Sequence, residues 1–308
     1  MKTLLALIRR NVKLFFRDKG TFFTAMITPL ILLVLFVSFL GDVYRDSLLL
    51  AIPAGMAVSE SVTEGFVGGW LFSSLLATCC VTVAFCSNMI MVEDRSRGAR
   101  RDLEMTPVRS SVLALSYYLS TALTTTIICF ISLGIGFLYL SVVGWYLSVT
   151  DVILCCLDVL LLVIFGTALS SVIVFFLSTQ GQIAAVGSIV SSCYGFVCGA
   201  YMPISQFSEG IQTVISCLPG TYGTGLLRRH LMGGALRQME TEGLPSDVTR
   251  EMADAFDNQL YFFDHAVGEG EMYAVLGVTV AVLIVIYVLF SRFLRKPVKV
   301  YHKSTKKV

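Results

Sequence analysis

Charged residues are scarce in this chain of 308 residues, where Asp, Glu, Lys and Arg together make up 14%. In an ordinary soluble domain these residues make up about 25%. Hydrophobic residues account for 56%, and they gather in apolar runs. Since about 20 apolar residues suffice for a helix to cross a bilayer, the composition excludes a soluble domain and indicates an integral membrane protein. No small-residue cleavage site follows the first apolar run, so we expect no signal peptide.

Motifs for nucleotide, metal and redox chemistry are also missing. The sequence has no Gly-x-x-x-x-Gly-Lys-Ser/Thr, so it lacks the loop that binds ATP phosphates. The spaced glycines at 220–225 follow no predicted strand, so they do not indicate a dinucleotide-binding site. The nine cysteines fall almost wholly in apolar runs without a C-x-x-C pair. The three histidines are scattered: His230, His265 and His302. We therefore expect no catalytic residue, no metal, no cofactor bound by this chain and no nucleic-acid partner.

Six apolar runs are predicted to span the membrane as helices. The third apolar run, 112–143, is about 48 Å long as a helix at 1.5 Å per residue, which exceeds a hydrocarbon core of about 30 Å. We expect its first turns to project into the cytosol, or Gly134 and Gly136 to end it early. Pro29 in the first run is tolerable if neighbouring helices cover the freed carbonyl. The predicted spans are about 21–40, 70–92, 112–140, 152–177, 183–201 and 272–293.

Residues 1–20 form a basic amphipathic segment ahead of the first predicted span. Arg9, Lys13 and Arg17 recur at intervals of four, and apolar residues such as Ile8 and Val12 lie between them. This pattern predicts an interface helix that lies in the headgroup layer on the cytosolic side. A flank of the first span with no further role is the alternative.

The segment 203–271, between the last two predicted spans, differs in character. Residues 204–234 contain so many prolines and glycines that they are too broken to span, yet they are too apolar for a free loop. A re-entrant pair of half-helices fits this pattern. Residues 239–271 carry nine acids and one base, and a helix start is predicted near Asp247. We place 203–271 at the external side of a single six-span domain, 21–308. The candidate residues of the re-entrant region are Pro203, Pro219, Tyr222 and Arg228.

Lysine and arginine are distributed unevenly between the two predicted sides of the membrane. Six lie in residues 1–20, five in residues 93–109 and seven in residues 292–308, whereas the remaining loops hold five bases among many acids. Because positively charged loops remain cytosolic, both termini and residues 93–109 are predicted to be cytoplasmic. Six spans agree with this topology, and the expected location is the cell membrane.

The loop EDRSRGARRDLEMTP, residues 93–107, is strongly charged and lies between two predicted spans. One Arg or Asp costs roughly 2.5–3.5 kcal/mol at mid-bilayer, so this loop must lie in water. We predict that Gly98 breaks the chain, that Arg100–Met105 forms a short helix, and that Pro107 ends it. Leu103 is expected to enter an apolar cleft of a partner. A solvated loop that only fixes the topology is the alternative.

Asp158 is the one acid placed well inside a predicted span. An intramembrane acid is a functional candidate by default. Two alternatives remain open: an acid satisfied by nearby Ser or Thr residues, and a position shallower than predicted.

Small residues on the fifth predicted span recur every four positions, which lets two helices approach closely. Packing within one chain, a dimer seam and a transport pathway are all compatible with this pattern. Hydroxyl residues on the second span are weaker candidates for the same roles, because they can bond their own helix carbonyls. The candidates are Gly187, Ser191, Gly195 and Gly199, with Ser74 and Thr78.

Three features in order resemble the permease subunits of type-2 ABC exporters, which include bacterial drug, lipid and polysaccharide exporters. The first is the amphipathic start running into RDKGTFFTAMITPLILLVLF, and the second is the charged loop. The third is MPISQFSEGIQTVISCLPGTYGTGLLRRHLMGG, with a Leu-Pro, an aromatic residue and an Arg shortly before a Gly. The loop positions that match are Asp94, Arg95, Arg97, Gly98, Leu103, Thr106 and Pro107.

The resemblance implies that the loop is a coupling helix that docks on a separate ATPase subunit carrying ATP and Mg²⁺. It also implies two permease copies or paralogues in the bilayer, and export of an amphipathic drug, lipid, peptide or glycan. Arg100 and Arg101 depart from the family, which usually has Leu and an acid there, and the acidic segment 239–271 is longer than expected. The coupling candidates are Glu93, Asp94, Arg95, Arg97, Gly98, Arg101, Leu103, Thr106 and Pro107.

Two other classes compete with this interpretation. An ion-coupled secondary transporter that uses Asp158 should show inverted repeats or paired broken helices, and breaks occur in only one half of the sequence. A membrane enzyme would need a nucleophile and base or a metal set, and neither is apparent.

Overall fold

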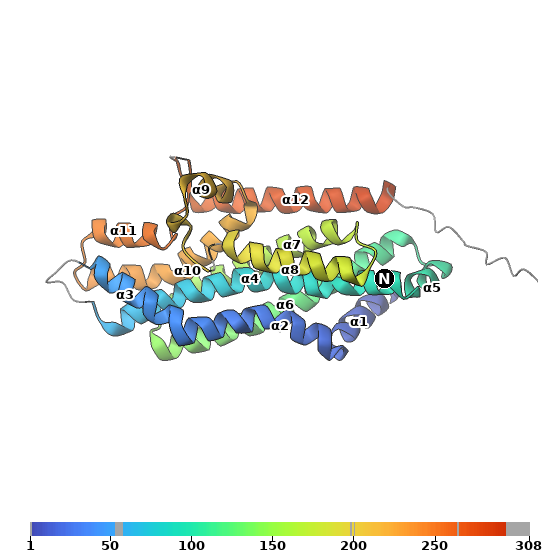
Figure 1. The fold of residues 1–308 in the computed structure, drawn as a ribbon, viewed down its shortest axis with the longest axis horizontal. Coiled ribbons are helices and arrows are strands. Elements are labelled where there is room, and N and C mark those ends of the chain that lie inside the picture. The colour runs from blue at the N-terminus through green and yellow to red at the C-terminus, as the bar shows by residue number, and fades with distance from the viewer. Residues whose placement is uncertain (1, 53–57, 198, 200, 264, 294–308) are drawn as a thin grey trace, which may run out of the picture.

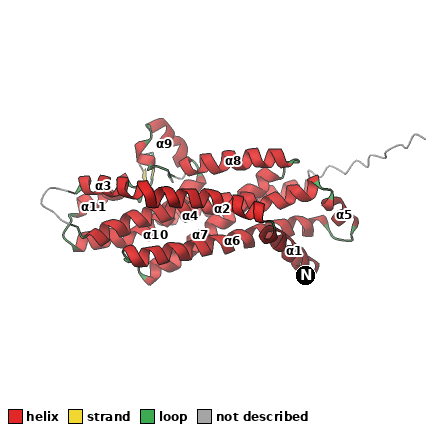
Figure 2. Ribbon diagram, turned by 60° about the horizontal axis from the view of Figure 1, so that its bottom comes forward, coloured by secondary structure: helices red, strands yellow, loops and turns green. Residues whose placement is uncertain are grey.

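The computed structural model describes residues 2–52, 58–197, 199, 201–263 and 265–293. It is an elongated bundle whose long helices run mostly along one axis (Figure 1). The strands of the described part form one short antiparallel hairpin, β1 (Tyr261–Phe262) with β2 (His265–Ala266). Helices dominate throughout (Figure 2), so the predicted all-α class is confirmed.

Helices occupy nearly all of the described chain. The first half contains α1 (Lys2–Arg17), α2 (Lys19–Leu35), the π-helix η1 (Phe36–Leu40), α3 (Gly41–Ala51), α4 (Glu60–Ser96), α5 (Ala99–Met105) and α6 (Ser110–Val143). The second half contains α7 (Val149–Val174), α8 (Gln180–Val197), the 3₁₀ helix η2 (Ile204–Gln206), α9 (Glu209–Ser216), α10 (Pro219–Thr241), α11 (Ser246–Ala255) and α12 (Glu269–Phe293).

Helix α4 is the central helix of the bundle. Its 37 residues extend beyond the predicted 70–92 span at both ends, and α2, α6, α7, α8 and α10 pack against it (Figure 1). The most apolar stretch of α4 is 89% buried, compared with 33% for α6 and 17% for α12. A helix that is apolar on all sides is typical of a bundle core or of a membrane span, and α12 leaves most of its apolar surface outside this bundle.

Within the residues that the structure describes, four helices are long and apolar enough to cross a membrane: α4, α6, α7 and α12. Residues 19–50 count as a fifth span if the 42° bend beside Pro29 is accepted. Proline lacks the N–H that would continue the helix, which explains the bend. Helix α8, at the predicted fifth span, is shorter and ends at Val197. A multi-pass membrane protein is therefore confirmed, but the predicted count of six spans is not.

Residues 204–234 contain two successive helices of unequal length, and their re-entrant placement in the membrane stays a prediction. The short α9 is followed by α10, which runs without interruption through Gly223 and Gly234. A Cβ at Gly223 would lie 2.4 Å from Cδ2 of Leu162, and one at Gly234 would lie 2.0 Å from the carbonyl oxygen of Tyr146. The glycines therefore permit close helix contact, as small residues do in membrane bundles, and they do not break this helix.

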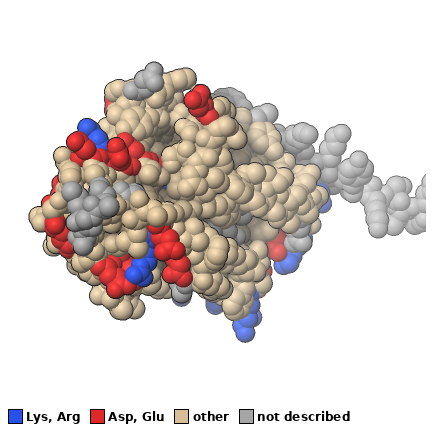
Figure 3. Space-filling view, turned by 60° about the vertical axis from the view of Figure 1, so that its left-hand side comes forward, with Lys and Arg blue, Asp and Glu red and all other residues tan. Residues whose placement is uncertain are grey.

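The end of the bundle remote from α5 carries α3 and α11 (Figure 1). A separate apolar cluster lies there, built around Tyr44, Trp70 and Phe256. Acidic side chains gather on the surface of this end (Figure 3). Helix α11 begins at Ser246, as the sequence predicted for the helix near Asp247.

Candidate functional site

A sharp turn at Gly98 separates α5 from the end of α4. Gly98 has φ of +83°, a left-handed conformation that glycine adopts without a steric penalty. Helix α5 then runs from Ala99 to Met105, and the Thr106 hydroxyl donates to the Leu103 carbonyl at 2.6 Å. The predicted break at Gly98 and the short helix after it are both present.

Asp94 faces the bundle rather than a partner. Its side chain accepts two hydrogen bonds from Arg10, of 2.7 and 2.9 Å, and one of 2.6 Å from the Tyr117 hydroxyl. Asp94 is 7% exposed. On the next residue of α1, the Asn11 amide donates to the Ser120 hydroxyl at 3.4 Å. Asp94 thus ties the end of α4 to α1 and α6, so its described contacts lie within this chain.

Arg95 also points inward, toward the end of α7. Its guanidinium donates to the carbonyl oxygens of Phe175, at 2.9 Å, and Leu177, at 3.0 Å, and it lies 5.6 Å from the Phe175 ring centre. The last carbonyls of a helix lack partners within that helix, so a cation here satisfies them. Arg95 caps α7, so this member of the predicted coupling loop joins α4 to the end of α7.

The outward surface of this region is formed by α5 and its flanks. Arg97 is 70% exposed and pairs with Glu93 at 3.1 Å, a surface contact that contributes little to stability. Leu103 packs, half-buried, against the main core, whereas Met105 is 84% exposed. The prediction that Leu103 faces a partner is therefore wrong, and Met105 is the apolar residue that α5 presents. Exposed polar and turn positions beside it are Arg101, Thr106 and Pro107.

Helix α1 has the two faces that the sequence predicted. Arg9, Lys13 and Arg17 are all exposed. The opposite face buries Leu7 and Phe15 against the main core. The basic stripe therefore lies on the surface, beside the end of the bundle that carries α5.

Asp158 is buried and satisfied by residues of two other helices. It is 1% exposed, it lies 2.6 Å from Nδ1 of His230 on α10, and it accepts a 2.6 Å hydrogen bond from the Tyr273 hydroxyl on α12. His230 Nε2 lies 3.3 Å from Glu269. Asp158 thus joins α7, α10 and α12, and its partners are His230 and Tyr273 instead of the nearby Ser or Thr residues of one sequence alternative.

Sequence analysis did not identify His230 as a partner of Asp158. It predicted that residues 204–234 are broken by prolines and glycines, so His230 could not be assigned to a helix face. The available signal was Asp158 itself, since an acid inside a bundle requires a polar or cationic partner.

Arg228 is fully buried at the centre of a second polar cluster. It forms an ion pair with Asp257 at 2.9 Å and donates to the Gly199 carbonyl at 2.6 Å and to the Ser74 hydroxyl at 3.3 Å. Asp257 also accepts from the backbone N–H of Ile204, at 2.5 Å. The cluster therefore fixes the connection between α8 and η2 to α4 and α10.

The other re-entrant candidates have structural contacts in the same region. Pro203 is buried just before η2, and Pro219 is the first residue of α10, where its missing N–H is harmless. The Tyr222 hydroxyl donates to the Ser216 carbonyl at 2.6 Å. These three residues shape the path of the chain from α8 into α10.

The predicted stripe of small residues does not form one continuous helix face. Gly187 and Ser191 lie on α8, but Gly199 comes after its end and has φ of +64°. A Cβ at Gly195 would meet the Tyr201 ring at 2.3 Å, so this glycine packs within the chain, while one at Gly187 would meet nothing within 4 Å.

Ser74 and Thr78 are both fully buried, and Thr78 bonds the Ser74 carbonyl of its own helix at 2.9 Å. They lie inside one chain, which disfavours a seam between two copies, whereas their alternative role in a transport pathway stays a prediction.

Residues 2–232 match the family model described as ABC-2 type transporter. This chain belongs to the ABC-2 type transporter family. The matched residues run from α1 into α10 and include α5 and the helices α1, α4, α6 and α7 beside it. A comparison with curated proteins found no match. The chain is thus a membrane component of an ABC transporter, a permease, and the alternative of a secondary transporter driven through Asp158 is not favoured.

Proposed function

We propose that this chain is the permease subunit of an ATP-driven exporter and that a separate ATPase subunit docks on α5. The observation that carries the proposal is the placement of α5, an isolated helix of 7 residues held at the tip of the most buried helix of an ABC-2 family member. The chain itself has no phosphate-binding loop, so ATP and Mg²⁺ would bind to the partner.

The contacts beside α5 support a rigid transmission of movement. Helix α5 follows α4 after only Arg97 and Gly98, and Leu103 anchors it to the main core. The last turn of α4 is joined to α1 and α6 through Asp94, and to α7 through Arg95. A push on α5 would therefore move four helices together, because packed and hydrogen-bonded groups shift as a unit.

The exposed residues of α5 fit a docking surface with an apolar centre. Met105 would supply the apolar contact, and Arg101 and Asp102 would supply charges at its edge. Aromatic residues, Met and Arg are the types enriched at protein interfaces. Arg97, paired with Glu93 on the surface, would add only a weak contact.

The α5 end would face the cytosol, together with both termini, because the bases of residues 1–20 and 93–109 gather there. A second permease copy or a paralogue would complete the pathway in the bilayer. The exported substrate would be amphipathic, whether a drug, a lipid, a peptide or a glycan.

Reconstitution in liposomes tests the ATP-driven class. The purified permease is expected to hydrolyse no ATP alone, and to gain hydrolysis with its co-purified ATPase subunit. A permease complex whose ATPase lacks its phosphate-loop Lys is the control. Hydrolysis by the permease alone, or export that stops when a protonophore is added in the presence of ATP, would contradict the proposal.

Orientation is tested by cysteine labelling in a cysteine-free background. Arg101→Cys, on α5, is expected to react from the cytosol, and Asp254→Cys, on α11, from outside. Labelling of Asp254→Cys from the cytosolic side would reverse the proposed topology.

A further inference from the structure

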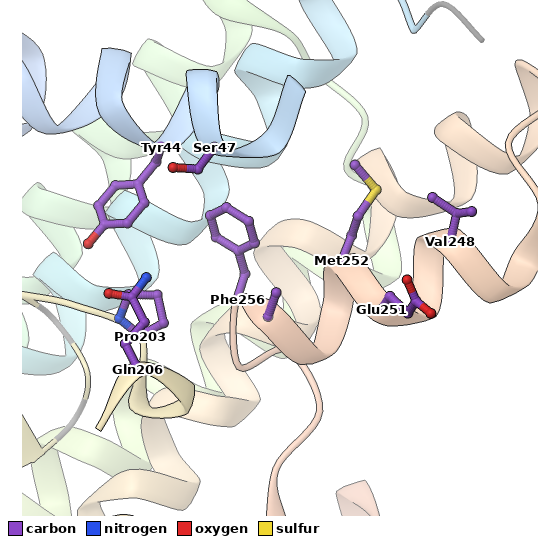
Figure 4. Close-up of a pocket in the computed structure, with 9 residues that line it drawn as sticks. Tyr44, Ser47, Pro203, Gln206, Val248, Glu251, Met252 and Phe256 are labelled. Carbon is purple, nitrogen blue, oxygen red and sulfur yellow. The ribbon is translucent and has the colours of Figure 1, made fainter. Parts of the chain in front are cut away.

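A pocket of about 290 Å³ opens at the end of the bundle remote from α5 (Figure 4). Three segments that are far apart in the sequence form it: α3, η2 and α11. Helix α11 lies beyond residues 2–232, the part of the chain that the family match covers. Of the predicted site residues only Pro203 lines this pocket, so neither the coupling surface nor the buried ion pairs account for it.

The inner wall of the pocket is apolar and already in place. Tyr44, Met252 and Phe256 are at most 7% exposed, and the Tyr44 ring lies 6.0 Å from the Phe256 ring and 4.4 Å from the Trp70 ring. The Tyr44 hydroxyl donates to the Tyr201 carbonyl at 3.2 Å, which fixes the ring. Ligand sites are commonly preformed clefts with such aromatic and aliphatic walls.

The rim of the pocket is polar, with Ser47, Gln206 and Glu251. Glu251 is the one charged residue of the lining, it is exposed, and within the described residues it makes no ion pair. Asp247 and Asp254 are on the same helix, its one base, Arg250, does not line the pocket, and acids dominate this face of the molecule (Figure 3). A hollow bordered by one sign of charge concentrates ligands of the opposite sign.

We propose that this pocket binds an amphipathic organic cation. The apolar body of the ligand would lie against Met252 and Phe256, and its positive group would lie between the Tyr44 ring and the Glu251 carboxylate. Aromatic faces attract cations, and most strongly where water is displaced. The volume is near the lower limit of ligand pockets, roughly 300–1,000 Å³, which fits a body of one ring with an alkylammonium group. The proposal does not depend on ATP-driven export, and its test needs no ATPase.

Calorimetric titration of the full-length permease in phosphatidylcholine nanodiscs tests the site, with benzyltriethylammonium as the probe. We expect saturable binding, about tenfold tighter than that of benzenesulfonate, an anion with the same ring. Glu251→Gln should weaken binding of the cation about three- to fivefold, as expected for one exposed charge pair. Asp247→Asn is the matched control, because it makes the same change in net charge on the same helix outside the pocket, and it should leave binding of the cation nearly unchanged.

Filling the pocket provides a second test that does not rely on charge. Ser47 is exposed at the rim, so Ser47→Phe should block the site and abolish binding without disturbing the core. Leu49→Phe, at a position 45% exposed that does not line the pocket, should bind like the wild type. No saturable binding by the wild type, equal binding of benzenesulfonate, or full binding by Ser47→Phe would each overturn the proposal.

Discussion

The Arg10 guanidinium holds the Asp94 carboxylate with two hydrogen bonds, of 2.7 and 2.9 Å, across 84 residues of sequence. Hydrogen bonding to Asp94 raises the pKa of Arg10, so the guanidinium remains charged. It makes α1 part of the same rigid end of the bundle that carries α5. A helix that the sequence placed in the headgroup layer is therefore also a structural support of the proposed coupling site.

Arg10→Ala should lower the free energy of unfolding by roughly 1.5–3 kcal/mol, because it removes charged hydrogen bonds and leaves Asp94 buried with the Tyr117 hydroxyl alone. The measurement is unfolding by SDS titration in mixed micelles, followed by tryptophan fluorescence. Arg9→Ala, at the exposed neighbouring position, is the control and should change stability by less than about 0.5 kcal/mol. Equal effects of the two substitutions would show that the pair stabilises nothing.

Met105→Asp should reduce complex formation and stimulated ATP hydrolysis while the isolated permease keeps its stability, because Met105 is 84% exposed. Truncation of a central interface residue typically costs about 2 kcal/mol of binding or more, and a charge should cost at least as much. Met105→Leu should restore both activities. Leu103→Asp is expected to destabilise the permease itself, since Leu103 packs on the core. Normal assembly and hydrolysis in Met105→Asp would remove α5 from the docking surface.

Tyr273→Phe should destabilise the bundle by roughly 1.5–3 kcal/mol, because its hydroxyl donates to the buried Asp158 carboxylate at 2.6 Å. Tyr118→Phe is a matched control, since the buried Tyr118 hydroxyl has no hydrogen-bond partner within the described chain. Its removal should be neutral or slightly stabilising. The comparison is made by SDS titration, and a larger loss in Tyr118→Phe would refute the assigned role of Asp158.

Gly234→Ala should destabilise the permease by about 1–3 kcal/mol, because the added methyl group would lie 2.0 Å from the Tyr146 carbonyl oxygen. Gly277→Ala, on α12, adds a methyl group that meets nothing within 4 Å. Alanine is the better helix former, so this control should be neutral or stabilising by up to about 1 kcal/mol. The midpoints of thermal unfolding distinguish these expectations, and a neutral Gly234→Ala would show that α10 is not closely packed there.

The sequence by itself determined the features that depend on local properties. Apolar runs exclude water, so they identified a membrane protein, and the charged loop at 93–107 had to lie outside the hydrocarbon. Gly98 and Pro107 interrupt helices because of their own backbone geometry. The short helix α5 between them could therefore be predicted from these two residues alone. The three sequence features that resemble type-2 ABC exporters, found in the same order along the chain, were sufficient to suggest the family.

Only the tertiary structure decided which way individual side chains face. Asp94 and Arg95 belong to one charged loop motif, yet both turn inward, because Arg10 of α1 lies beside Asp94 and α7 ends beside Arg95. His230 meets Asp158 across 72 residues, and the glycines of α10 are contact points because Tyr146 and Leu162 approach them. Such relationships depend on which helices pack together, and that is settled by the summed burial and hydrogen bonding of residues far apart in the chain.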